Sequence, residues 1–153
     1  MSAILTLCGG FLLAVLWMDL MFDVQTLRYA CSRPELPEEV LRSIAAYYRR
    51  VTTDARPMGN LVGVVMIVTI VVLVVRIIGG HEARWIDLTS LALCGAPILL
   101  AWLRVVPNAA RLGSQVDSPA QQSALARGIC RDHLFCLVAI SAFVALQLCA
   151  ALR

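Results

Sequence analysis

The chain contains little charge and no lysine. Of its 153 residues, 15% are charged and 60% are apolar, and all 13 basic residues are arginines. A soluble domain carries about 25% charged and about 45–50% apolar residues, so this chain has too few charges to cover a surface that faces water. Glycine, proline and cysteine are also too scarce for a collagen-like or a disulfide-rich chain. These shortages exclude the soluble, disordered and fibrous classes and leave an integral membrane protein.

The sequence also lacks the motifs of common catalytic and metal-binding sites. It has no Cys-x-x-Cys pair, no His-Glu-x-x-His or Glu-x-x-His spacing, and no glycine-rich phosphate loop. The net charge of +3 is explained by anionic lipid headgroups and by the charge bias of membrane loops, so it does not indicate a nucleic-acid partner. We therefore expect no metal, no resident cofactor and no nucleic acid.

Four apolar stretches are long enough to cross a bilayer, which takes about 20 residues in a helix. Because lipid offers no hydrogen bonds, the backbone of each stretch must satisfy its own polar groups, and this requires helices. The sequence predicts an all-α integral membrane four-helix bundle in one domain, 1–153, with transmembrane helices at about 3–22, 58–78, 85–106 and 134–152.

Several local features refine this layout. Gly59 and Gly63 form a small-xxx-small pair for helix packing on the second span, which is otherwise rich in Val and Ile. Pro97 is expected to kink the third span. The segment from Ser118 to Gln121 matches a capping box, so the fourth helix should begin near Pro119, several turns before it enters lipid.

An amphipathic helix is predicted at about 37–52, between the first two spans. Its apolar residues recur at helical spacing, and Pro37 suits a first helical position. We expect it to lie at the lipid headgroups with Tyr47 and Tyr48 as anchors. The helix should break before Pro57, because a residue that precedes proline avoids helical geometry.

The arginines indicate an orientation. Ten of them lie in or beside the first and third connections, and three lie near the termini and the second connection. Basic loops stay on the cytoplasmic side, so both termini are expected outside and the two long connections inside. This places Trp17 and Trp102 at the inner interface and Trp85 at the outer one. The expected location is the inner (cytoplasmic) membrane of a bacterium.

Ionisable and amide side chains from all four spans gather at the predicted cytoplasmic end. One interpretation is structural, in which these groups cap helices and form ion pairs that set helix depth. The other is a polar pocket that binds a lipid headgroup or a proton, or contacts a quinone or pigment. The candidate ligand-binding residues are Asp19, Asp23, Asn60, Arg104, Asn108, Arg131 and His133.

His133 is the candidate catalytic base in the second interpretation. Its ordinary pKa of about 6.5 suits proton transfer, provided that Asp19 or Asp132 accepts a hydrogen bond from its other ring nitrogen. The same region carries a family resemblance. With Pro107, Asn108 and Leu112 at the end of the third span and His133 at the start of the fourth, the chain resembles the anthrone-oxygenase-like family of small membrane proteins. The resemblance implies a cofactor-free oxidation of a polycyclic phenol by O₂, with His133 as the base.

No strong catalytic constellation is present, and we therefore expect an accessory or structural subunit of a larger membrane complex. The first alternative is the oxygenase-like enzyme. The second is an oligomeric channel or carrier, although polar residues are few within the spans. The expected partners are the lipid bilayer and either a larger membrane-protein complex or further copies of the chain.

Overall fold

The computed structural model describes residues 1–29, 35–80 and 83–152. Within these residues the chain is helical and contains no strand, which confirms the predicted all-α class. The elements are α1 (Ser2–Asp23), η1 (Val24–Tyr29), α2 (Glu38–Arg49), η2 (Arg50–Asp54), α3 (Arg56–Gly79), α4 (Arg84–Leu100), η3 (Ala101–Val105), α5 (Val106–Ser114) and α6 (Pro119–Ala151).

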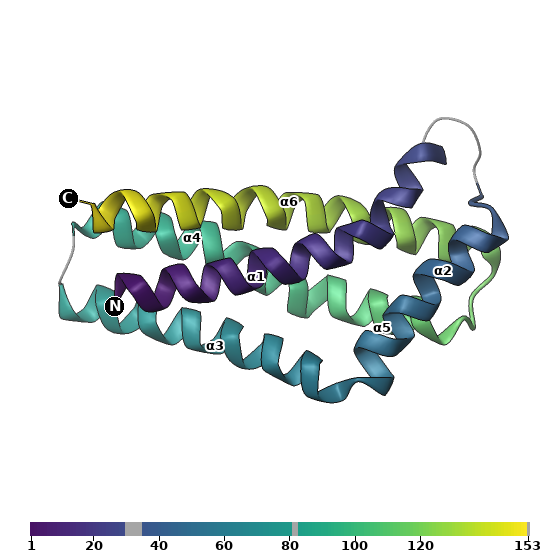
Figure 1. Ribbon diagram of the computed structural model, residues 1–153, viewed down its shortest axis with the longest axis horizontal. Coiled ribbons are helices and arrows are strands. Elements are labelled where there is room, and N and C mark those ends of the chain that lie inside the picture. The colour runs from purple at the N-terminus through teal and green to yellow at the C-terminus, as the bar shows by residue number, and fades with distance from the viewer. Residues whose placement is uncertain (30–34, 81–82, 153) are drawn as a thin grey trace.

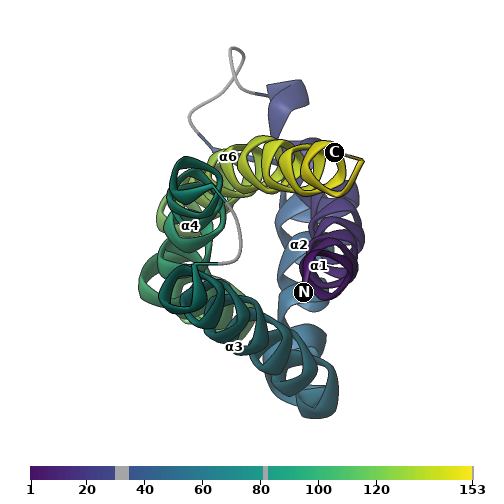
Figure 2. The same ribbon diagram turned by 90° about the vertical axis from the view of Figure 1, so that its left-hand side faces the viewer.

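The described residues include four helical segments that are long and apolar enough to cross a membrane. They cover Ser2–Tyr29, Pro57–Gly79, Arg84–Ser114 and Pro119–Ala151. The segments run side by side along the long axis of the molecule (Figure 1). Helix α1 packs against α6 and α3, and α4 packs against the same two helices, so the four surround a common axis (Figure 2). Both termini lie at one end, here called the terminal end, and α2 lies at the other, here called the α2 end.

The third membrane segment extends beyond its predicted end, whereas the fourth helix begins at the predicted residue. The third continues past residue 106 to Ser114 through η3, a π-helical turn. This irregular turn begins four residues after Pro97, whose ring nitrogen cannot donate a backbone hydrogen bond. The fourth begins at Pro119, as predicted. The Ser118 hydroxyl accepts a hydrogen bond from the Gln121 backbone at 3.4 Å, and the Gln121 side chain completes the capping box.

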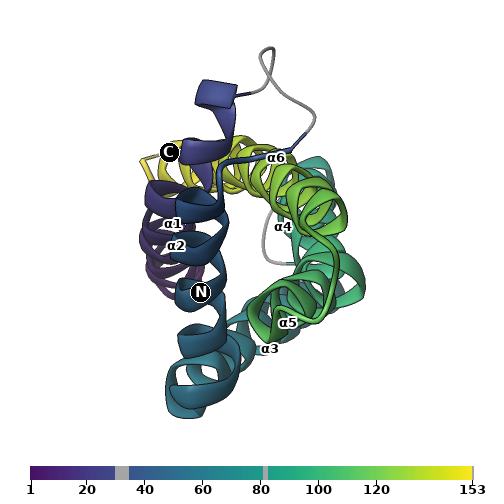
Figure 3. The same cartoon turned by 90° about the vertical axis from the view of Figure 1, so that its right-hand side faces the viewer.

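Helix α2 crosses the α2 end from the side of α6 towards the start of α3 (Figure 3). The chain leaves α2 at Arg49 and passes through η2 before α3 begins, so the predicted break before Pro57 is confirmed. The close contact between α2 and α5 depends on Gly113 of α5. A Cβ atom at this position would lie 2.7 Å from the Arg49 backbone nitrogen and 2.9 Å from the Arg49 Cα.

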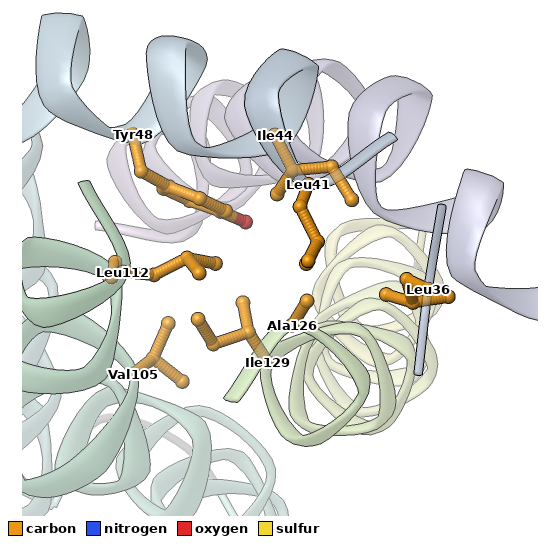
Figure 4. Packing of buried hydrophobic residues seen from close by; sticks show 9 residues of the cluster. Leu36, Leu41, Ile44, Tyr48, Val105, Leu112, Ala126 and Ile129 are labelled. Carbon is orange, nitrogen blue, oxygen red and sulfur yellow. The ribbon is translucent and has the colours of Figure 1, made fainter. Parts of the chain in front are cut away.

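The apolar face of α2 contacts the protein itself. Leu41, Ile44 and Tyr48 are buried against Leu112 of α5 and Ile129 of α6 (Figure 4). Burial of such side chains contributes roughly 1.5–3 kcal/mol each relative to leaving them exposed. The amphipathic pattern therefore predicted the helix, but this face meets α5 and α6 where we expected lipid headgroups. Tyr48 in particular is not a membrane anchor, because it is enclosed by protein.

Candidate functional site

A polar cluster joins α1, α2 and α6 at the α2 end. Asp19 and Asp23 lie one turn apart on α1 and face the adjacent tyrosines of α2. The Tyr47 hydroxyl donates to Asp19 Oδ1 at 2.6 Å, and the Tyr48 hydroxyl donates to Asp23 Oδ1 at 2.7 Å. His133 of α6 completes the cluster, with its Nδ1 atom 2.6 Å from Asp23 Oδ2.

Asp23 is the centre of this cluster. Its exposed fraction is 0%, and those of Tyr48 and His133 are 3% and 5%. A carboxylate can only accept hydrogen bonds, so the short contact indicates that His133 Nδ1 carries a hydrogen and donates a hydrogen bond to Asp23 Oδ2. Nε2 of His133 lies 3.8 Å from Asp19 Oδ2, a distance for an ion pair but too long for a hydrogen bond.

The two tyrosines remain hydrogen-bond donors. Burial is the main cause that raises the pKa of Tyr48 far above its ordinary value, and the Asp23 and Asp19 carboxylates raise it further. Burial and Asp19 raise the pKa of Tyr47 in the same way. The Tyr47 ring also stacks on Phe22 with ring centres 4.1 Å apart. These hydroxyls therefore stay protonated and hold α2 against α1.

A separate ion pair lies beside the cluster. Asp132 of α6 is buried, and its Oδ2 atom is 2.9 Å from Arg104 Nε, while Oδ1 is 3.8 Å from Arg131 Nε. Asp132 was a candidate partner for His133, but its carboxylate faces the two arginines, and Asp23 holds the imidazole. The pairing of Asp132 with Arg104 ties α6 to η3.

The structure brings together part of the predicted set. Asp19, Asp23 and His133 meet directly, while Arg104 and Arg131 meet at Asp132. Asn60 is exposed on α3 and Asn108 is half-buried on α5. Neither amide forms a hydrogen bond with the cluster in the part of the chain that is described. Trp17, Trp85 and Trp102 are all exposed, and their interface role stays a prediction.

The polar cluster acts chemically as a set of paired groups. Among the described residues no set of three His, Cys, Asp or Glu side chains is arranged to hold a metal ion. His133 is enclosed by Asp23, Tyr48 and Asp19, and it lines neither of the two hollows beside α3. What the geometry supports is a hydrogen-bonded fastening of α2 onto α1 and α6.

A second buried network lies at the terminal end, and it is absent from the predictions made above from the sequence. The Arg76 guanidinium of α3 donates from Nε to Asp87 Oδ1 of α4 at 2.8 Å and from Nη1 to Gln147 Oε1 of α6 at 2.9 Å. Gln147 Nε2 in turn donates to Ser90 Oγ at 2.6 Å. Arg76 Nη1 also lies 3.3 Å from Ser2 Oγ of α1. This network connects all four membrane-spanning segments.

Counting the arginines of each connection does not reveal this network, because such a count uses Arg76 only as an indicator of orientation. Arg76 and Asp87 are 1% and 2% exposed. A usable signal was present, since these opposite charges flank the short connection between two predicted spans and Gln147 interrupts an apolar run. A buried charge in a membrane protein requires such a partner.

An apolar groove lies between one side of α3 and the continuous segment of α4, η3 and α5, which contributes Ile98, Trp102 and Val106. It consists of two adjoining hollows of about 550 Å³ and 200 Å³ that share Met66, Ile67 and Trp102. Gly59 and Gly63 line the larger hollow. The glycine pair that we expected to pack within the protein therefore faces outward, and a Cβ atom on Gly63 would meet no atom within 4 Å.

Comparison with known proteins assigns a family. A sequence model of the SHR3 chaperone family, described as ER membrane protein SH3, matches residues 1–150. The chain belongs to the SHR3 chaperone family. No curated protein and no solved structure matches it. Membership agrees with an accessory role among other membrane proteins in a lipid bilayer.

Family membership corrects two expectations. The resemblance to the anthrone-oxygenase-like family is wrong, because the match over residues 1–150 is to a different family of membrane proteins. Its motif consisted of a few residues at helix ends, where Pro, Asn and His occur for structural reasons in many helical membrane proteins. The bacterial inner membrane is also wrong, since the SHR3 family belongs to the ER membrane. Arginine bias reports sidedness and carries no information about the organelle. The predicted sidedness of the connections stays a prediction, because the family match does not test it.

Proposed function

We propose that this chain is a packaging chaperone of the ER membrane. It binds other membrane proteins inside the bilayer and assists their assembly without catalysing a reaction. The observation that carries this proposal is the match to the SHR3 chaperone family over residues 1–150.

The distribution of surface supports the proposal. A protein that assists others within lipid needs apolar helix faces that its own fold leaves uncovered. Within the apolar part of the segment Pro57–Gly79 only 17% of residues are buried, against 28%, 33% and 28% in the other three segments. Buried polar networks at both ends hold the helices together, so these faces can stay uncovered without loss of the fold.

The test is depletion of the chain in its host cell. We expect a subset of polytopic membrane proteins to remain in the ER, while soluble secreted proteins leave it at the normal rate. Restoring the chain should restore export. The measurement is the fraction of each protein that acquires post-ER glycan processing. Normal export of every membrane protein after depletion would refute the proposal.

A further inference from the structure

We infer that the groove along α3, lined by Gly59, Gly63, Met66, Ile67 and Trp102, docks one transmembrane helix of a client protein. This inference rests on the proposed function and assigns it a surface. The groove continues from the larger hollow into the smaller one along the same side of α3, where Val71 lies beyond Ile67.

The spacing of the lining residues forms one ridge of the helix. Every fourth position of α3 contributes to this ridge, namely Gly59, Gly63, Ile67 and Val71, so these residues lie on one face of the helix. The side chains of this ridge are small near the α2 end and bulky further along the helix. Such a small-xxx-small face lets the backbone of a second helix approach closely, typically at a crossing angle near −40°.

The chain's own packing does not explain the two glycines. Glycine within a helix costs about 1 kcal/mol relative to alanine. At Gly9 and Gly113 close neighbours offset that cost, because an added Cβ would lie 2.6 Å from Val144 Cγ2 and 2.7 Å from the Arg49 nitrogen. Gly63 has no atom within 4 Å of such a Cβ, and at Gly59 the closest atom is the Val51 carbonyl oxygen at 3.6 Å. Their space is open to a second helix.

The location of the groove favours a helix as the occupant. From Gly59 to Val71 the ridge is about 18 Å long at 1.5 Å per residue, which is more than half of a hydrocarbon core of about 30 Å. Only lipid chains and membrane-spanning segments reach that depth, and a chaperone of membrane proteins meets segments that have not yet found their own partners. The exposed Asn60 amide beside the glycines offers a hydrogen bond to a polar group on that helix.

The test uses the purified full chain in phosphatidylcholine vesicles. A photo-crosslinking benzoylphenylalanine replaces Ile67 in the groove or, as a control, Leu7, which is exposed on α1 outside both hollows. The probe is a Leu/Ala transmembrane peptide of roughly 20 residues with a central Gly-x-x-x-Gly. A matched peptide carries leucines in place of both glycines.

We expect the glycine peptide to crosslink at position 67 and not at position 7. Gly63→Leu should fill the groove and reduce the yield at position 67 about tenfold, equivalent to about 1.4 kcal/mol. Gly10→Leu is the matched control, because Gly10 also has no atom within 4 Å of an added Cβ but lines neither hollow. It should leave the yield unchanged. Equal yields from both peptides, adducts to lipid alone, or crosslinks mainly to a second copy of the chain would each overturn the inference.

A second measurement separates this inference from the proposed function. Cells depleted of the chain are supplied with the Gly63→Leu or the Gly10→Leu variant, and export of the retained membrane proteins is measured. Rescue by Gly10→Leu alone supports the groove as the docking site. Full rescue by Gly63→Leu overturns this docking site and leaves the proposed chaperone function unaffected. If depletion itself has no effect on export, the proposed function fails, whereas crosslinking in vesicles still decides the groove.

Discussion

Removal of Arg76 should destabilise the protein more than removal of any exposed arginine. Arg76→Leu takes two donors from Asp87 and one from Gln147, and it leaves the Asp87 carboxylate buried without its cation. Breaking a buried pair in this way costs about 3–5 kcal/mol. A chain of this size loses about 2–4 °C in melting temperature per kcal/mol, so we expect a decrease of about 6–20 °C.

A second single variant and the double variant distinguish the effect of the lost ion pair from the effect of lost packing. Asp87→Leu alone should be similarly harmful, because among the described residues the guanidinium then keeps only Gln147 and Ser2 as hydrogen-bond partners. The double variant with leucine at both positions removes both charges and should recover most of the loss, since apolar replacements of a buried ion pair are often neutral. Arg42→Leu serves as the control. It removes an exposed pair with Glu38, and such pairs contribute about 0–1 kcal/mol.

The chain's own thiols provide the assay. Of the five cysteines in the described part of the chain, Cys8, Cys94, Cys130 and Cys136 are buried, while Cys149 is exposed. A fluorogenic maleimide in mild detergent therefore reacts with Cys149 at the start and with the buried thiols as the protein unfolds on heating. The reasoning fails if either single variant melts with the wild type, or if the double variant is as unstable as the sum of the two single variants.

Two further predictions concern α2. Tyr48→Phe removes a buried donor from Asp23 and should cost about 1–3 kcal/mol, seen as a lower melting temperature in the same maleimide assay; an unchanged melting temperature would show that this hydroxyl does not hold α2. Gly113→Ala should push α2 away from α5, because the added Cβ meets backbone atoms of Arg49, and amide hydrogen exchange across α2 should rise. Gly128→Ala is its control, since that Cβ meets no atom within 4 Å, and equal exchange in the two variants would contradict the close contact.

The polar cluster could be predicted in part. Helical periodicity placed Asp19 and Asp23 on one face, and the apolar runs placed His133 at the same end. The sequence pattern did not indicate that Tyr47 and Tyr48 turn toward those carboxylates. The pattern of an amphipathic helix is the same whether its apolar face meets lipid or protein. Asn60 was included by depth alone, and depth does not say which way a side chain points around its helix.

The amino-acid sequence by itself determined the class of the protein, the presence of four helices long and apolar enough to span a membrane, and several of their ends. These properties depend on composition, on lengths of apolar runs and on local signals such as the Ser118 capping box, all of which act over a few neighbouring residues. Only the tertiary structure decided that Arg76 meets Asp87 and Gln147, that α2 is fastened to α1 and α6, and that Gly59 and Gly63 face an open groove. Those outcomes depend on how each helix is rotated against the others, and in lipid an apolar helix has no hydrophobic stripe that reveals this rotation.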